Sequence, residues 1–207
     1  MGSEAYERFM ASTDIDYERW HDGVPYDLTA LAELDGAERA EVETLLLTRA
    51  GEDWRDLEGL LAIGSQRART AVVTQLRHGS IQQRLEAAKR LPPDPAIERD
   101  REAAIVQGLA ESTLLTGLSA VIGLAETYST PLVINALFRA LLRPDREIGV
   151  HAAALLAFLH GKAKEPFDWE LRPLFLRFNT PDRQEREAAF RDLCALCKVD
   201  SAPYLRR

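Results

Sequence analysis

Four side chains near the start of the chain, Asp14, Asp16, His21 and Asp22, combine the oxygen and nitrogen donors from which metal sites are built. They lie on both sides of Trp20. Short acidic side chains also cap helices, and a neighbouring tryptophan can pack over the first helices of the fold. We interpret the group in this second way, because the end of a helical stack needs a polar cap. We therefore expect no metal ion.

Two cysteines, Cys194 and Cys197, stand in an apolar stretch with helical spacing. A structural zinc site needs four ligands, and there is no second cysteine pair to complete one. A redox pair would follow a strand, and no strand is predicted before these residues. We expect both thiols to be buried in a helix. His151 and His160 lie over two turns apart on another expected helix, too far apart to share a metal, and are interpreted as ordinary helix residues.

Signatures of catalysis are missing from the sequence. It has no glycine-rich phosphate loop after a strand and no Gly-x-Ser-x-Gly elbow to expose a nucleophile. We therefore expect no catalytic residue and no cofactor.

The charge balance favours a protein partner over a nucleic acid. There are 26 basic and 33 acidic residues, which gives a net charge of −7 with both signs interspersed. Nucleic-acid binding would need Arg99, Arg101, Arg143 and Arg146, which lie near expected helix ends, to gather on one face, since no basic stripe exists. An acidic surface suits a basic partner. The start of the chain does not resemble a secretory signal and no segment is apolar enough to span a membrane, so we expect a cytoplasmic protein.

Helical periodicity dominates the chain and strand-like alternation is almost absent, so the elements that position these residues are predicted to be helices. Asp27, Ser65 and Thr130 are expected N-caps, and Gly64 is an expected helix end. The expected helices cover 28–34, 37–49, 53–63, 65–78, 81–91, 96–109, 112–128, 130–142, 145–160, 168–178 and 182–196.

These helices recur in pairs. The second helix of each pair is expected to start at Ser80, Ser112, Asp145 and Asp182, at intervals of 32, 33 and 37 residues. Such a period is typical of stacked helix pairs. The Pro-Asp-Arg triplets 144–146 and 181–183 open two of these helices in the same way.

Residues 37–196 therefore resemble a run of about five HEAT-like repeats. The resemblance implies an all-α fold, a right-handed α-α solenoid, with residues 1–36 as N-terminal capping helices and 37–207 as the solenoid of one domain. Two features depart from the pattern. Gly117 and Gly123 lie within the helix expected at 112–128, and Pro173 interrupts the helix expected to begin at Asp168.

Exposed polar side chains of the second helices, together with one aromatic anchor, are the candidate partner-binding residues, although a solvated face explains the polar ones equally well. Tyr26 and Tyr204 are further possible anchors, whereas Trp54 and Trp169 are expected to pack inside their repeats. The candidates are Gln83, Arg84, Glu86, Lys89, Glu126, Arg146, Glu147, Arg183, Glu187 and Trp20.

A curved stack of helix pairs offers a long surface with little chemistry of its own, so we expect a non-catalytic protein-binding module. Small acidic solenoids that look like this one act as immunity proteins, which occlude a basic toxin domain, or as adaptors and scaffolds. Two enzyme classes remain as alternatives by resemblance, namely DNA glycosylases and bilin lyases with HEAT-like folds. The acidic balance counts against the glycosylase alternative.

Overall fold

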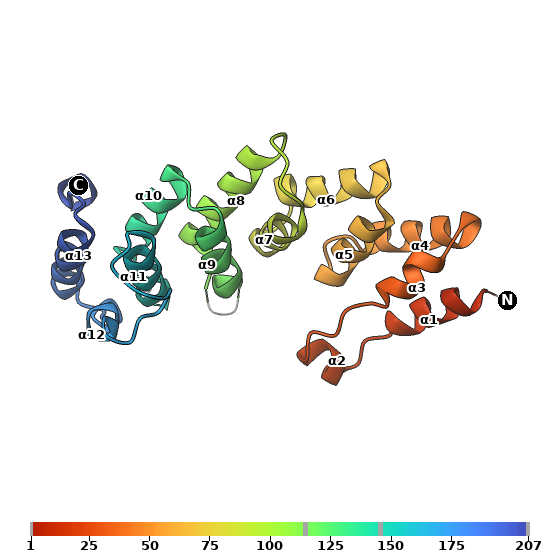
Figure 1. The fold of residues 1–207 in the computed structure, drawn as a ribbon, viewed down its shortest axis with the longest axis horizontal. Coiled ribbons are helices and arrows are strands. Elements are labelled where there is room, and N and C mark those ends of the chain that lie inside the picture. Colours follow the sequence, from red (N-terminus) through yellow and green to blue (C-terminus); the bar gives the residue numbers. More distant parts are fainter. Residues whose placement is uncertain (1, 114–115, 145–146, 206–207) are drawn as a thin grey trace. The chain divides into compact units, whose positions relative to one another are not determined.

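The computed structural model describes residues 2–113, 116–144 and 147–205, and in these ranges α-helices are joined by turns and loops (Figure 1). The described ranges contain no strand, so the all-α prediction is confirmed. None of the helices within them is long and apolar enough to cross a membrane. The chain divides into two compact units, Met1–Asp94 and Pro95–Arg207. The division expected at residue 36 remains a prediction.

Helices of the first unit pack in consecutive pairs. Helix α1 packs on α3, α4 on α5, and α6 on α7, while α5 also contacts α3 and α7. Helix α5, the second helix of its pair, therefore contacts the second helix of each neighbouring pair, α3 and α7. The helices are α1 (Glu4–Ser12), α2 (Tyr17–His21), α3 (Leu28–Glu33), α4 (Gly36–Arg49), α5 (Trp54–Ile63), α6 (Gln66–His78) and α7 (Ile81–Arg90).

Short polar side chains set the starts of these helices, as predicted. The carboxylate of Asp27 accepts a hydrogen bond from the backbone N–H of Ala30 at 2.8 Å, and Ser65 Oγ accepts one from Ala68 at 3.0 Å. Gly64 ends α5 with φ +72°, a left-handed conformation that glycine adopts without strain. Helix α1 was not predicted individually, because its sole buried residue, Phe9, gives a weak periodic signal.

In the second unit α8 pairs with α9 and α10 with α11, whereas α12 and α13 both pack on α11. Helix α8 packs on α9 and α10, and α11 packs on α9, α10, α12 and α13. The helices are α8 (Glu98–Glu111), α9 (Leu118–Thr127), α10 (Pro131–Ala140), α11 (Glu147–Leu159), α12 (Arg172–Leu176), α13 (Arg183–Cys197) and α14 (Ala202–Leu205).

A helix expected to start at Ser112 begins later, and that prediction is wrong. Ser112 is the buried C-cap of α8, and α9 starts at Leu118. Between them, the backbone N–H of Thr113 donates to Thr116 Oγ1 at 3.0 Å, and Gly117 adopts φ +97°. A residue in this left-handed region interrupts a right-handed helix. The intervals of 32 and 33 residues measured through Ser112 therefore do not mark a helix start.

Pro173 was also assigned incorrectly. It does not interrupt a helix, because α12 begins at Arg172 and places the proline in its first turn, where the missing N–H has no intrahelical partner to lose. Asp168 precedes the helix in a turn, and its carboxylate accepts hydrogen bonds from the backbone of Lys164 and Glu170, both at 2.9 Å. These bonds lower the pKa of Asp168.

The core of the second unit contains the two thiols and an aromatic cluster. Cys194 and Cys197 are buried in α13, as predicted, and burial raises their pKa values to about 12 and about 11. The rings of Phe138 and Phe190 meet edge to face with centroids 6.2 Å apart. Trp169 was expected to pack inside its repeat, but 67% of its surface is exposed, so that prediction is wrong.

Candidate partner-binding surfaces

The acidic excess lies at one end of the sequence. Residues 1–63 contain 16 acidic and five basic side chains, a net charge of −11. Residues 64–94 contain two acidic and six basic side chains, and residues 95–207 contain 15 of each sign. Charges of both signs alternate along the chain, so this local excess of acidic residues becomes visible only when charges are counted segment by segment. The exposed carboxylates are those of Glu4, Glu7, Asp14, Asp16, Glu18, Asp22, Glu33, Asp35, Glu41 and Glu52. We call these ten residues the acidic surface.

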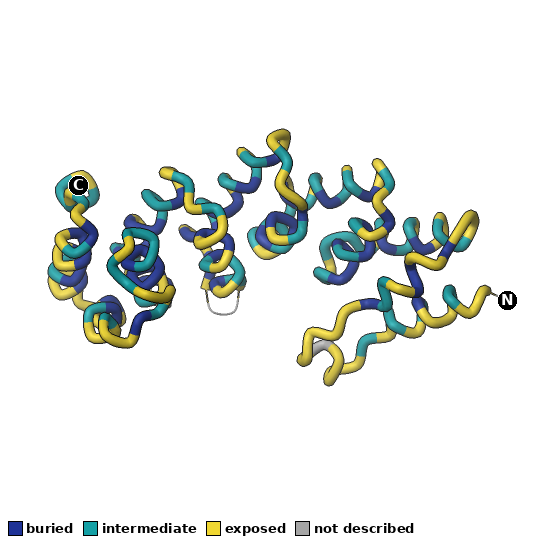
Figure 2. Tube along the Cα trace, in the orientation of Figure 1, coloured by how far each residue is buried: buried dark blue, intermediate teal, exposed yellow. Residues whose placement is uncertain are grey.

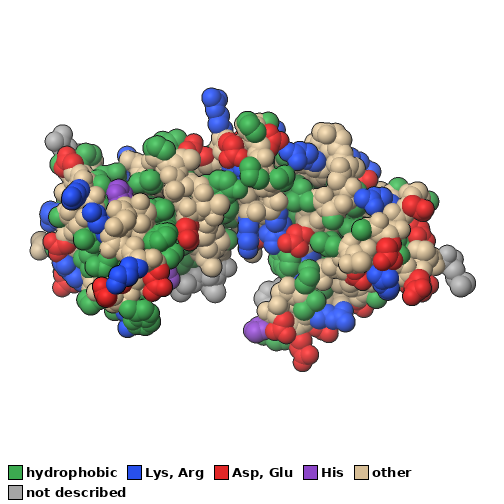
Figure 3. Space-filling model, in the orientation of Figure 1, with side chains coloured by type: hydrophobic (Ala, Val, Ile, Leu, Met, Phe, Trp, Pro, Cys, Tyr) green, Lys and Arg blue, Asp and Glu red, His purple; other side chains and the backbone are tan. Residues whose placement is uncertain are grey.

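Basic side chains in this part of the chain do not offset the acidic surface. Among residues 2–63, the exposed lysines and arginines are Arg8 and Arg19 alone. Arg8 is paired with Asp27 at 3.5 Å and Glu33 at 3.2 Å. On the face shown in Figure 3, red acidic side chains lie over α1 to α4. A surface with this sign attracts cationic partners and repels phosphate.

Two of the five arginines in residues 1–63, Arg39 and Arg55, are engaged inside the unit and are not exposed. Arg39 donates to the backbone carbonyl of Ile63 at 3.0 Å. Arg55 is fully buried, and its guanidinium donates to the carbonyl of Val24 at 2.7 Å and to the Asp53 carboxylate at 2.6 Å. Because these guanidinium groups donate to backbone carbonyls within the unit, the exposed charged side chains of residues 2–63 are mostly carboxylates.

The buried guanidinium also anchors the most exposed stretch of the acidic surface. Residues 14–25, which include α2, are largely exposed (Figure 2). Arg55 reaches this stretch through the carbonyls of Val24 and Arg19, the latter at 3.3 Å. Next to it, the Tyr26 hydroxyl donates to the Asp56 carboxylate at 3.0 Å, and both residues are buried. Burial raises the pKa of Asp56 to about 6 and also raises that of Tyr26.

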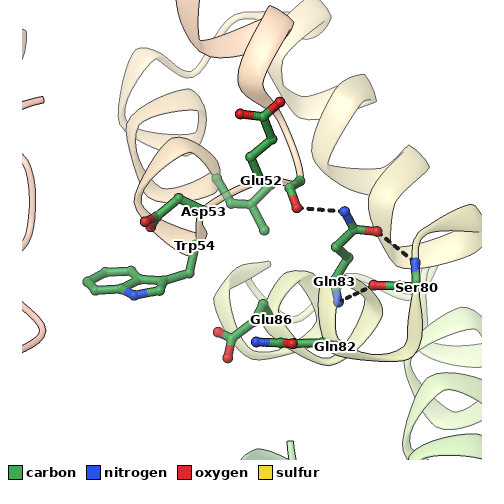
Figure 4. Close-up of a pocket in the computed structure, with 9 residues that line it drawn as sticks. Glu52, Asp53, Trp54, Ser80, Gln82, Gln83 and Glu86 are labelled. Carbon is green, nitrogen blue, oxygen red and sulfur yellow. Dashed lines mark hydrogen bonds between the residues drawn. The ribbon is translucent and has the colours of Figure 1, made fainter. Parts of the chain in front are cut away.

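A pocket of about 330 Å³ lies between the loop before α5 and the start of α7 (Figure 4). Its acidic side chains are Glu52, Asp53 and Glu86, and Gln82 lies beside Glu86 on α7. The ring of Trp54 forms part of the wall. The guanidinium groups of Arg55 and Arg90 stack over this ring at 4.8 and 4.7 Å from its centroid. Trp54 therefore contacts arginines of its own unit.

Gln83 was predicted to contact a partner, but its side chain is engaged within the unit. Its Nε2 donates to the carbonyl of Gly51 at 2.6 Å, and its Oε1 accepts from the backbone N–H of Ser80 at 2.7 Å (Figure 4). With the Ser80 hydroxyl bond these contacts form a capping box at the start of α7. Gly51 has φ +104°, and a Cβ there would lie 2.8 Å from Gln83 Nε2. The glutamine thus fixes both the loop and the helix start.

Replacing Gln83 with alanine is expected to lower the free energy of unfolding by about 1–2 kcal/mol, because one cap and one loop anchor are lost. The neighbouring Gln82 is exposed, so Gln82→Ala should change it by less than about 0.5 kcal/mol. Urea denaturation followed by circular dichroism measures both. Equal effects of the two substitutions would contradict the anchoring role.

The remaining candidate partner-binding residues that the structure describes lie on several helices. Arg84 donates to the carbonyl of Leu76 at 3.0 Å, whereas Lys89 and Glu126 are exposed. Arg146 lies outside the described residues, as do the side chains of Glu147 and Trp20. The partner-binding role of the ten candidates remains a prediction.

Two candidates meet on α13 in the second unit. Arg183 and Glu187 line a pocket of about 320 Å³ and form an ion pair at 2.7 Å. Glu187 also pairs with Arg191 at 3.4 Å. Glu187 offsets only one of these two arginines, so this part of α13 does not extend the acidic surface.

The group first considered for metal binding has a local structural role. The Asp16 carboxylate accepts a hydrogen bond from the backbone N–H of Arg19 at 2.8 Å, so the capping interpretation is confirmed for this residue. His21 lies 3.2 Å from Asp22. Within the described ranges, no three His, Cys, Asp or Glu side chains are placed to hold a metal ion.

Two of the four arginines that could have formed a nucleic-acid face serve the fold instead. Arg101 is fully buried, with its guanidinium 4.7 Å from the centroid of the Tyr128 ring. Arg143 donates to the carbonyl of Leu109 at 2.7 Å.

The candidate partner-binding surface is therefore the acidic surface of the first unit. Comparison of the chain with known protein families, curated proteins and solved structures finds no match.

Proposed function

We propose that this chain is a non-catalytic protein-binding module whose acidic surface binds a basic protein. The observation that carries the proposal is the charge of −11 in residues 1–63, with ten exposed carboxylates against two exposed arginines. Complementary charge accelerates and orients protein association. The same charge repels nucleic acid and opposes a phosphate-binding role.

We further propose that the helix pairs stack as a right-handed solenoid of HEAT-like repeats. The contacts of α5 with α3 and α7, and of α11 with α9 and α13, support this arrangement within each unit. In stacked repeats each pair buries its apolar face against the next, which leaves an extended surface for a partner.

For the partner, we favour a basic toxin domain that the chain occludes as an immunity protein, with an adaptor role as the alternative. Occlusion needs a surface that covers a basic cleft, and the acidic surface supplies the charge. We place the protein in the cytoplasm, where the reduced thiols of Cys194 and Cys197 would persist.

Affinity purification from the native host, with quantitative mass spectrometry, tests the proposal. The triple variant Asp14→Lys, Glu18→Lys, Glu52→Lys reverses three carboxylates of the acidic surface. We expect the wild type to enrich a basic protein and the variant to retain about tenfold less of it, because like charges then face each other. Binding should also weaken as salt rises.

Reversal of three exposed carboxylates in the second unit, Glu111→Lys, Glu165→Lys, Glu170→Lys, is the matched control and should retain the protein. A bound protein that inhibits growth alone, and stops doing so when this chain is co-expressed, supports immunity; a harmless one supports an adaptor. Enrichment of only acidic proteins, or equal loss in both triple variants, would overturn the proposal.

A further inference from the structure

An apolar groove lies between α1 and α4. Tyr6 and Met10 line it from α1, and its volume is about 650 Å³. From α4 it is lined by Ala37, Ala40, Glu41, Val42, Thr44, Leu45 and Thr48. Most of these α4 positions are exposed, and only Val42 among them is buried.

Polar bonds hold the two helices side by side along this groove. The Ser3 backbone N–H and hydroxyl each donate to Glu38 at 2.6 Å, and the Tyr6 hydroxyl donates to Glu41 at 2.7 Å. Both pairs are separated by 35 residues in sequence, so α1 and α4 run in the same direction and in register. The bond from Ser3 lowers the pKa of Glu38, which keeps this carboxylate ionised.

Small side chains line the α4 side of the groove. Ala37, Ala40, Thr44 and Thr48 follow one another at helical spacing along one face of α4. From residue 37 to residue 48 this face is about 17 Å long, at 1.5 Å per residue, which matches about three turns of a docked helix. Small residues allow a second helix to approach closely, while Leu45 and Met10 offer apolar contacts at its sides.

The charges around the groove are negative, because the cations of α1 and α4 are engaged elsewhere. Arg8 pairs with Asp27 and Glu33, and Arg39 donates to the carbonyl of Ile63. Arg49 lies close enough to the buried Asp56 to lower its pKa. Glu41 remains exposed on the groove wall.

We propose that the groove between α1 and α4 binds an amphipathic helix of the partner, with its apolar face on Ala40 and Thr44 and with lysine or arginine at its edges. A helix that binds in a groove contacts it through apolar side chains spaced three and four residues apart. The negative charges around this groove favour a helix that carries lysine or arginine. This proposal rests on the proposed function, because it gives the binding segment of the basic partner.

Binding of a fluorescein-labelled peptide of leucine and lysine, with leucines at helical i, i+3, i+4, i+7 spacing, tests the groove by fluorescence anisotropy at 0.15 M salt. A peptide of the same composition with evenly scattered leucines measures attraction by charge alone. We expect the amphipathic peptide to bind about tenfold more tightly than the scattered one.

Thr44→Trp fills the groove and should weaken binding of the amphipathic peptide about tenfold. Thr74→Trp is the matched control, because both threonines are exposed on helices of this unit and donate to the carbonyl four residues earlier at 2.9 Å. It should bind as the wild type does. Thr48→Trp, also on the groove, replaces Thr44→Trp if that variant does not fold, as judged by circular dichroism.

Unchanged binding by a folded groove variant overturns the groove proposal. If Asp14→Lys, Glu18→Lys, Glu52→Lys still abolishes peptide binding in that case, the proposed function survives. If neither peptide binds the wild type, the groove proposal fails, and the affinity purification decides the proposed function separately. A wild-type dimer in sedimentation that becomes monomeric in Thr44→Trp would assign the groove to a second copy of the chain and would also overturn the inference.

Discussion

Replacing Arg55 with methionine is expected to lower the free energy of unfolding by about 2–4 kcal/mol, because the substitution removes a fully buried guanidinium that pairs with the partly buried Asp53 carboxylate. The Arg55 side chain is fully buried and paired with Asp53 at 2.6 Å. Methionine reaches only as far as the arginine Nε and has no donors, so the carbonyls of Val24 and Arg19 lose their partners as well. Urea denaturation followed by circular dichroism measures the loss.

Two further substitutions separate the guanidinium from a general effect of removing arginine. Arg67→Met removes an exposed arginine on α6 and should change stability by less than about 0.5 kcal/mol. Arg55→Lys keeps the charge but lacks the fork that reaches several acceptors, so it should fall between the wild type and Arg55→Met. A loss below about 1 kcal/mol in Arg55→Met would contradict the anchoring role.

The anchor matters for function because it holds residues 14–25, which carry Asp14, Glu18 and other carboxylates of the acidic surface. In Arg55→Lys we expect faster amide hydrogen exchange in this stretch than elsewhere in the unit, since local opening no longer breaks the full set of bonds. A preorganised charged surface binds with less ordering cost than a mobile one.

Local signals made most helices of the fold predictable. Asp27, Ser65 and Thr130 cap helices as expected, since a cap is a relation between residues two or three positions apart. The prediction failed at Ser112, where the left-handed Gly117 separates two apolar stretches that are continuous in the sequence pattern. The periodic pattern of apolar residues does not predict the φ and ψ angles of an individual glycine.

The roles of long polar side chains could not be predicted, because their acceptors are backbone carbonyls from other segments. Gln83 reaches Gly51, Arg84 reaches Leu76, and Arg55 reaches Val24. A residue's place on a helix face indicates that it is polar and outward, but not that its end folds back onto a loop. The charge excess in residues 1–63 was accessible from the sequence by counting.

Asp56→Asn is expected to stabilise the protein at pH 7 by up to about 3 kcal/mol relative to its effect at pH 4. The Asp56 carboxyl is 1% exposed, and burial raises its pKa to about 6 from a usual value of 3.8. The negative charge of Asp53 raises it further, while the Tyr26 hydroxyl, Arg49 and the Asp53 backbone N–H lower it. Burial outweighs these favourable contacts.

The direction of the pH effect follows from the raised pKa. Below about pH 4 the Asp56 carboxyl is protonated in both folded and unfolded chains, so its contribution to stability is fully present. As the pH rises through 6, the unfolded chain is already ionised and the folded chain must ionise a buried group, so that contribution is lost. Asparagine stays neutral and its amide oxygen still accepts the Tyr26 hydrogen bond, so the variant avoids this loss.

Denaturation of wild type and Asp56→Asn at pH 4, 5, 6 and 7 measures the difference, and the pH 4 pair serves as the internal control. Carbon-detected NMR titration of the Asp56 carboxyl gives its pKa directly. Tyr26→Phe removes the hydroxyl that donates to the carboxylate and should raise this pKa above about 6. A midpoint near 4 in the wild type, or a stability difference that does not grow between pH 4 and pH 7, would show that water reaches this carboxylate.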